Sequence, residues 1–250
     1  MPPQLPNEAQ RLAMSERPAA RQVMHQRWGD LLFLHWPVDA ALIQRKLPGG
    51  LYIDTFGSQA WIGVVPFYME RIRPVGMPPV PGISWFLELN VRTYVHDSKG
   101  RPGVWFFSLD CNQPFAVGVA RRFFHLPYQH AWMKAVREGE TIDYHSRRRS
   151  PGAKVAEFRY QRANKPEPAS PGTLEWFLVE RYVLFSTSRH GKLFYGQVHH
   201  PPYRIQQGTC EKWSAEPLLL NGFPDPGTEP PSILVAESLQ VSVFPLVPLL

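Results

Sequence analysis

The sequence predicts an α+β fold in which one large, mainly antiparallel sheet curls into a barrel-like body with a few short helices. The 27 prolines in 250 residues disfavour a helical bundle, because proline interrupts helices. Short strand-like runs follow one another along the chain with turn-forming residues between them. The 44% hydrophobic content supports a sizeable core. We expect a flexible, proline-rich arm at residues 1–20 and a single domain at residues 21–250.

The first half of the chain is expected to hold strands with one short helix and one long loop between them. LLFLHW forms the first strand. Asp39 caps a helix at 40–46, because its carboxylate can accept N–H bonds from the first turn. The proline- and glycine-rich stretch 73–82 is a loop long enough to form a pocket wall. Further strands are expected at 51–54, at 60–68 and in a hairpin that begins near Trp85.

The second half opens with a helix from Pro114 to about Phe124, since proline is favoured in a first helical turn. One or two more helical turns are expected at 131–138, and Thr173 caps another short helix. The rest is expected to be strands at 140–149, 154–162, 182–187, 193–199, 203–207 and 233–243.

Polar side chains that could take part in catalysis or ligand binding alternate along the first strand of the hairpin. Glu88, Asn90, Arg92 and Tyr94 share one face by the two-residue period of a strand. This face is either an ordinary exposed sheet face or the lining of a cavity. In a closed cavity Glu88 is a candidate general acid or base with a raised pKa. Arg92 or Arg121 is a candidate for bidentate binding of a carboxylate.

The second strand of the hairpin adds Asp110 to this group. If the turn is symmetric about Gly100, Arg92 lies opposite Ser108 and Asn90 lies opposite Asp110. Asp110 is then a diagonal neighbour of Arg92, within reach of its long side chain.

Seven segments in specific order resemble the YqjF-like family of uncharacterised proteins. This resemblance covers most of residues 25–245 and implies a fold distantly similar to that of acetoacetate decarboxylase. It also implies that Asp54 and Arg181 are neighbours of a pocket. The segments are WGDLLFLHWPVD, LPGGLYIDTF, AWIGVVPF, ELNVRTYV, VWFFSLD, ARRFFHLPY and VHHPPY.

The acetoacetate decarboxylase motif can be laid on ARRFFHLPYQ without gaps. Its arginine then falls on Arg121, its Schiff-base lysine on Tyr128 and the neighbouring lysine on Gln129, while an upstream glutamate falls on Glu88. Tyrosine cannot form an imine, so the resemblance implies a protein without Schiff-base decarboxylation. Tyr128 is either a donor to a bound carbonyl group or a packing residue with a polar tip.

Several function classes lack their sequence signals. The net charge of +6 comes from scattered basic residues without a nucleic-acid-binding motif, so no nucleic acid partner is expected. No apolar run is long enough to span a membrane, and we expect a cytoplasmic protein. Zinc-binding and dinucleotide-binding motifs are absent, so no metal or cofactor is expected. His199 and His200 are adjacent on a strand and point to opposite faces, so each is expected to have a structural or hydrogen-bonding role.

These observations predict a protein that binds a small polar organic ligand, anionic or carbonyl-containing, in a sheet-lined cavity. Lyase- or hydratase-like acid–base chemistry is one possibility. The alternative is a non-catalytic binding or interaction protein that keeps the fold without the chemistry. The sequence leaves the ligand's identity and the oligomeric state open. The catalytic candidates are Glu88 and Tyr128, and the ligand-binding candidates are Asn90, Arg92, Tyr94, Asp110 and Arg121.

Overall fold

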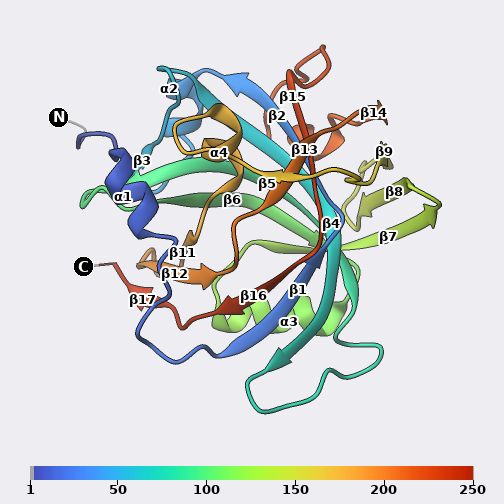
Figure 1. The fold of residues 1–250 in the computed structure, drawn as a ribbon, viewed down its shortest axis with the longest axis horizontal. Coiled ribbons are helices and arrows are strands. Elements are labelled where there is room, and N and C mark those ends of the chain that lie inside the picture. The colour runs from blue at the N-terminus through green and yellow to red at the C-terminus, as the bar shows by residue number, and fades with distance from the viewer. Residues whose placement is uncertain (1–2, 250) are drawn as a thin grey trace.

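The computed structural model describes residues 3–249 and consists of strands with a few short helices (Figure 1). The helices are α1 (Glu8–Ala13), α2 (Ala40–Gln44), α3 (Pro114–Phe123), α4 (Leu174–Val179) and α5 (Glu216–Leu219). The strands are β1 (Met24–Gly29), β2 (Leu31–Val38), β3 (Leu51–Ile53), β4 (Ala60–Pro74), β5 (Phe86–Asp97), β6 (Pro102–Cys111), β7 (Tyr128–Glu138), β8 (Thr141–Arg148), β9 (Ala156–Gln161), β10 (Glu167–Pro168), β11 (Val183–Thr187), β12 (Leu193–His199), β13 (Arg204–Gln207), β14 (Cys210–Lys212), β15 (Ser232–Ala236), β16 (Leu239–Val243) and β17 (Val247–Pro248).

Seven of these strands form a closed ring in the order β1, β4, β5, β6, β11, β12, β16 and back to β1. All neighbours in the ring are antiparallel except β6 and β11, which pair in parallel at Val104 and Leu184. The ring confirms the predicted barrel-like body with its mainly antiparallel sheet. Its interior is the space in which a ligand site can form.

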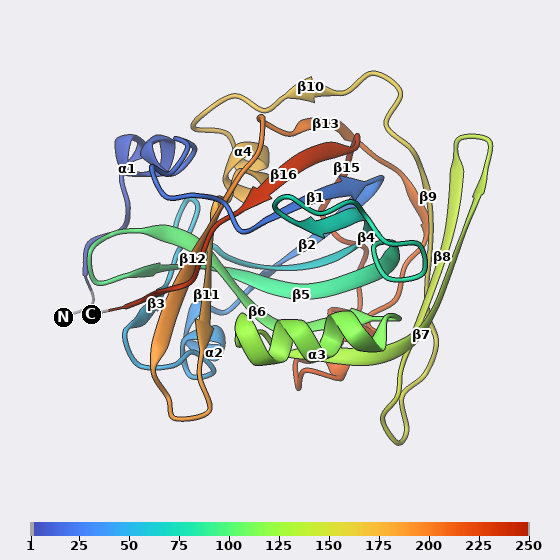
Figure 2. The same ribbon diagram turned by 90° about the horizontal axis from the view of Figure 1, so that it is seen from below.

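Further strands extend the ring on two sides. β2 pairs with β4, and β15 and β13 continue outward from β2. On the other side, β7 starts parallel to the end of β6 and projects from the barrel with β8 and β9 (Figure 2). Helix α3 packs beside β6 and β7 (Figure 2). No helix in the described part of the chain has the length and apolar character needed to cross a membrane.

Strand β5 lies between two apolar cores. Leu87, Leu89 and Val91 pack in one core with residues of β2 and β8. The opposite face of β5 looks into the ring, where Phe67 and Val104 belong to the second core. Both faces of β5 are covered, so its alternating polar side chains do not lie on an ordinary exposed sheet face.

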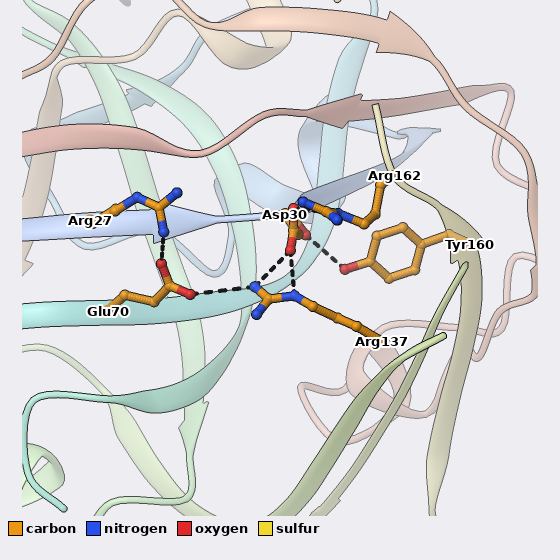
Figure 3. Close-up of polar contacts among 6 residues, drawn as sticks. All are labelled: Arg27, Asp30, Glu70, Arg137, Tyr160 and Arg162. Atoms are coloured by element: carbon orange, nitrogen blue, oxygen red, sulfur yellow. Dashed lines mark hydrogen bonds and ion pairs between the residues drawn. The ribbon is translucent and has the colours of Figure 1, made fainter. Parts of the chain in front are cut away.

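Asp30 connects the projecting strands to the ring (Figure 3). Its carboxylate accepts hydrogen bonds from Nε of Arg137 at 2.7 Å and from Nε of Arg162 at 3.1 Å. Its backbone carbonyl accepts one from the hydroxyl of Tyr160 at 2.7 Å. Glu70 of β4 contacts the same Arg137 at 3.4 Å. The barrel and the strands β7 and β9 are therefore joined by a buried carboxylate as well as by packing.

Most predicted elements are found close to their expected positions, including the caps. Asp39 accepts the N–H of Ala41 at the start of α2, and Thr173 accepts that of Trp176 at the start of α4. The hairpins β8–β9 and β11–β12 lie where the turn residues predicted them.

Two expectations about elements were wrong. The segment 131–138 belongs to strand β7 because it pairs along its length with β8, and this pairing overrides the helix-forming tendency of its residues. The segment 233–243 forms two strands, since β15 pairs with β2 whereas β16 pairs with β1. The N-terminal arm contains α1, which the sequence did not predict, because the side chain of Asn7 accepts the N–H of Gln10 and caps a helix there.

Candidate functional site

The interior of the ring holds a cavity of about 480 Å³. Its apolar walls come from ring strands far apart in the sequence. Its exposed lining residues lie in the loop between β4 and β5 and on α3, so the cavity opens between these two segments. Apolar wall residues include Met24, Leu31, Val65, Phe67, Val104, Phe106, Leu109, Val183 and Val243.

Glu88 and Tyr128 meet in this cavity. Glu88 is 3% exposed, and its Oε2 accepts a hydrogen bond from the hydroxyl of Tyr128 at 2.5 Å. Tyr128 enters the site because β7 begins there, parallel to β6, with Tyr128 beside Leu109. Asn90 lies two residues along the same face of β5, and its side chain lowers the pKa of Glu88. The structure thus brings together three predicted site residues, of which Glu88 and Tyr128 are 40 positions apart in the sequence.

Burial changes the protonation of this pair. Loss of water raises the pKa of Glu88 to about 7, although the hydrogen bonds from Tyr128 and Asn90 oppose the shift. Burial and the neighbouring Glu88 raise the pKa of Tyr128 well above its ordinary value. Near neutral pH Tyr128 therefore keeps its proton, while Glu88 is close to its midpoint and can accept or release one.

Two arginines line the same cavity. Arg92 follows Glu88 and Asn90 on β5 and donates from Nη2 to the carbonyl of Leu178 at 2.9 Å. Arg181, which follows α4, donates from Nε to the carbonyl of Phe177 at 2.9 Å. Burial lowers the pKa of Arg181 to about 10, so its guanidinium group is charged at neutral pH.

Asp54 lies behind these arginines and does not line the cavity. It is fully buried and contacts Nη1 of Arg181 at 3.1 Å. Its two oxygens accept from the guanidinium of Arg11 on α1, each at 2.6 Å. The resemblance had implied that Asp54 and Arg181 border a pocket. The sequence carried no signal for Arg11, whose partner is 43 residues away.

Asp110 is not part of the cavity, and the predicted register of its hairpin was wrong. A bulge between Val91 and Arg92 places Asn90 opposite Leu109 and Asp110 opposite Leu89. A shift of one residue moves a side chain to the other face of a sheet. Leu109 consequently lines the cavity, and Asp110 points outward.

On that outer face Asp110 accepts a hydrogen bond from Nε of Arg148 at 2.9 Å. Arg148 also donates to the hydroxyl of Ser108 at 2.7 Å. Arg148 was not among the predicted site residues, because it lies on β8, 38 residues further along the chain.

Two other candidates lie outside the cavity lining. The hydroxyl of Tyr94 donates to the carbonyl of Leu178 and lies 2.7 Å from Nε2 of His35, so this tyrosine is a buried support behind the site. Arg121 is exposed on α3 and donates from Nε to the carbonyl of Tyr128 at 2.7 Å. It therefore positions the backbone of a site residue from outside.

Tyr203 lines the cavity and was not among the predicted site residues. It ends the segment VHHPPY, and its N–H donates to Oε1 of Glu180 at 2.7 Å. Its neighbour His200 is buried, stacks on Tyr182 with 4.4 Å between ring centres, and has a pKa lowered to about 4 by burial. Among residues 3–249 no cluster of metal-ligating side chains is present.

The sequence of this chain is similar to the sequences of known proteins. Residues 25–240 match the model of the DUF2071 family, described as an uncharacterized conserved protein. The uncharacterized protein YqjF of Bacillus subtilis (strain 168) is 42% identical over 189 residues, which cover 76% of this chain and 77% of that protein.

Two solved structures extend the comparison to lower identity. The enduracididine biosynthesis enzyme MppR, complexed with the condensation product of pyruvate and imidazole 4-carboxaldehyde, aligns with a TM-score of 0.61 and 13% identity, over 94% of this chain and 90% of that one. An acetoacetate decarboxylase-like enzyme from Sphingomonas wittichii RW1 aligns with a TM-score of 0.62 and 12% identity, over 92% of this chain and 94% of that one. At these low identities, the TM-scores show a common fold alone.

Proposed function

Because the chain belongs to the DUF2071 family and has an acetoacetate decarboxylase-like fold, we propose that it binds a small anionic or carbonyl-containing organic molecule in the cavity of its barrel. The observation that carries this proposal is the Glu88–Tyr128 hydrogen bond inside an apolar cavity that opens to solvent. Ligand sites are typically concave and largely apolar, with a few convergent polar groups.

The pair supports acid–base chemistry on the bound molecule. With its pKa near 7, Glu88 in its ionised form accepts a proton from a carbon beside a carbonyl group or from a hydroxyl group. The Tyr128 hydroxyl turns from Glu88 to donate a hydrogen bond to the carbonyl oxygen. The surrounding apolar walls keep water away from both groups. None of the lining residues in the described part of the chain is a lysine, which supports a route without an imine.

A proton-exchange assay tests this chemistry. Small 2-oxo and 3-oxo acids are incubated with the protein in deuterated water, and exchange at the carbon beside the carbonyl is followed by NMR. Glu88→Gln and Tyr128→Phe are each expected to slow exchange by about 10²–10⁴-fold, the usual contribution of a general acid or base. Arg122→Gln is the control, since Arg122 is exposed on α3 and lies outside the cavity lining. Unchanged exchange in Glu88→Gln would refute the assigned role.

The alternative is a binding protein without catalysis. One observation favours it: Tyr128 and Glu88 satisfy each other in the cavity, as a structural pair does. Binding of oxo acids in a thermal-shift assay, with no exchange and no other turnover, would support this alternative. Borohydride treatment in the presence of oxo acids is expected to leave every lysine unmodified, and a trapped imine would contradict both versions.

A further inference from the structure

Two guanidinium nitrogens at the inner end of the cavity have no hydrogen-bond partner among residues 3–249. Nε of Arg92 and Nη2 of Arg181 are buried and make no hydrogen bond within the described residues. Both arginines are 7% exposed and both line the cavity. Their guanidinium carbons lie 5.7 and 5.0 Å from the centre of the Tyr94 ring, so the two groups are neighbours. Buried donors without partners are costly, and a bound acceptor would satisfy them.

The charges around these donors are unbalanced. Asp54 is the one carboxylate paired with this group in the described chain, and it is shared by Arg181 and Arg11. Arg92 has no acidic partner there. His35, which contacts Tyr94, has its pKa lowered by burial and by the charge of Arg92, so it is neutral near pH 7 and does not change this balance. Three guanidinium groups thus face one carboxylate, which favours an anion at this end.

The free nitrogens indicate the kind of anion. One nitrogen on each of two neighbouring guanidinium groups, Nε of Arg92 and Nη2 of Arg181, is free, and these two nitrogens match the two oxygens of one carboxylate. A phosphate group has three terminal oxygens, so two of them would have to share Nη2 of Arg181.

The rest of the cavity is suited to an apolar body. The lining face of β5 runs from Phe86 near the mouth to Arg92 at the inner end, about 20 Å along a strand of six steps. Apart from Glu88 and its partners the walls along this path are mainly aliphatic or aromatic, and the rim exposes Met77, Val80 and Phe115.

From these observations we propose that the ligand is an amphipathic carboxylic acid. Its carboxylate lies between Arg92 and Arg181, and its aliphatic or aromatic body extends past Glu88 toward the mouth between α3 and the β4–β5 loop. This inference rests on the proposed function, since it presumes that the cavity binds an organic molecule, and it names the class of that molecule.

Calorimetric binding to the full-length protein tests the class of ligand. The probes are decanoate, 1-decanol and decyl phosphate, which share an apolar chain and differ in the head group. Decanoate is expected to bind at least tenfold more tightly than either of the others. Equal or tighter binding of 1-decanol would overturn the inference and leave cavity binding intact, and tighter binding of decyl phosphate would overturn the choice of carboxylate.

Variants locate the head group. Arg92→Gln is expected to weaken the binding of decanoate at least tenfold while 1-decanol binds as before, and Arg122→Gln, at an exposed position outside the cavity lining, is expected to change neither. If Arg92→Gln fails to fold, as judged by circular dichroism, the comparison of the three probes on the unaltered protein still tests whether the ligand is a carboxylic acid. Decanoate binding that depends on Arg92, together with oxo-acid exchange that is absent or insensitive to Glu88→Gln, would uphold this inference and refute the acid–base chemistry. No binding by any probe would refute the inference.

Discussion

Glu88 is the main candidate for acid–base chemistry in the cavity, and its burial has a measurable effect on the stability of the folded protein. Raising the pKa of Glu88 from 4.5 to about 7 means that the folded protein binds its proton more tightly than the unfolded chain does. The folded state is therefore favoured fully below about pH 4.5 and loses this contribution as pH rises through about 7. At about 1.4 kcal/mol for each pKa unit, the loss is roughly 3 kcal/mol.

Glu88→Gln should remove this pH dependence. Relative to the unaltered protein, the variant is expected to gain stability between pH 4.5 and pH 8, approaching roughly 3 kcal/mol at the upper end. Urea unfolding at a series of pH values measures the difference. Glu140→Gln, which alters an exposed carboxylate, is the control and should show no such trend. A stability difference that stays constant with pH would contradict the assigned burial effect.

At this scale the sequence predicted some site residues and misplaced others. The alternation of β5 identified Glu88, Asn90 and Arg92, because a two-residue period needs only the strand itself. Asp110 was misplaced by one bulge, which depends on how two strands pair and leaves no mark in either strand. Tyr128 was found only through the resemblance, since its place depends on a parallel pairing between β6 and β7.

At the scale of elements, Asp30 is the main polar connection between the barrel and the strands β7 and β9. Its carboxylate is 5% exposed, whereas Arg137 and Arg162 are more than a third exposed, so solvent screens part of the attraction. Asp30 also has a φ of 46°, which asparagine tolerates well.

Asp30→Asn therefore removes the charge without straining the backbone. We expect a loss of about 1–3 kcal/mol in unfolding free energy, as for a hydrogen bond to a charged group. Amide hydrogen exchange is expected to rise first in β7–β9. Lys212→Gln, which removes an exposed contact at 3.8 Å with Glu157, is the matched control and should change neither quantity. Faster exchange spread evenly over the barrel would show that Asp30 does not act locally.

The sequence could not reveal that β7–β9 form a projecting sheet. Residues 131–138 contain good helix formers, and only the ladder with β8 makes them a strand. By contrast, the turns of the hairpins β8–β9 and β11–β12 and the caps of α2 and α4 were predicted correctly, because each depends on a few adjacent residues.

At the scale of the whole molecule, the ring closes where β6 and β11 run in parallel. Gly103 permits this approach: a Cβ atom there would lie 2.6 Å from the carbonyl oxygen of Val183 and 2.8 Å from the ring of Phe185. The composition predicted a curled sheet, but pairing between strands about 80 residues apart could not be inferred from local patterns.

Gly103→Ala should widen or strain the junction between β6 and β11. We expect a loss of about 1–3 kcal/mol, typical of an overpacked site, and a lower Tm in calorimetry. Gly118→Ala on α3 meets open space and should raise stability by about 0.5–1 kcal/mol. A Gly103→Ala variant as stable as the unaltered protein would show that the ring tolerates a wider junction.

The pairing of β1 with β16 has a consequence for synthesis of the chain. The first and the last strands of the ring are neighbours in space but about 200 residues apart, so the barrel cannot close until residues 239–243 have left the ribosome. Until then β1 and β12 each keep an unpaired edge, which is the kind of edge on which strands aggregate. The cavity therefore does not exist before β16 has paired with both edges, and the chain is most exposed to aggregation at that stage.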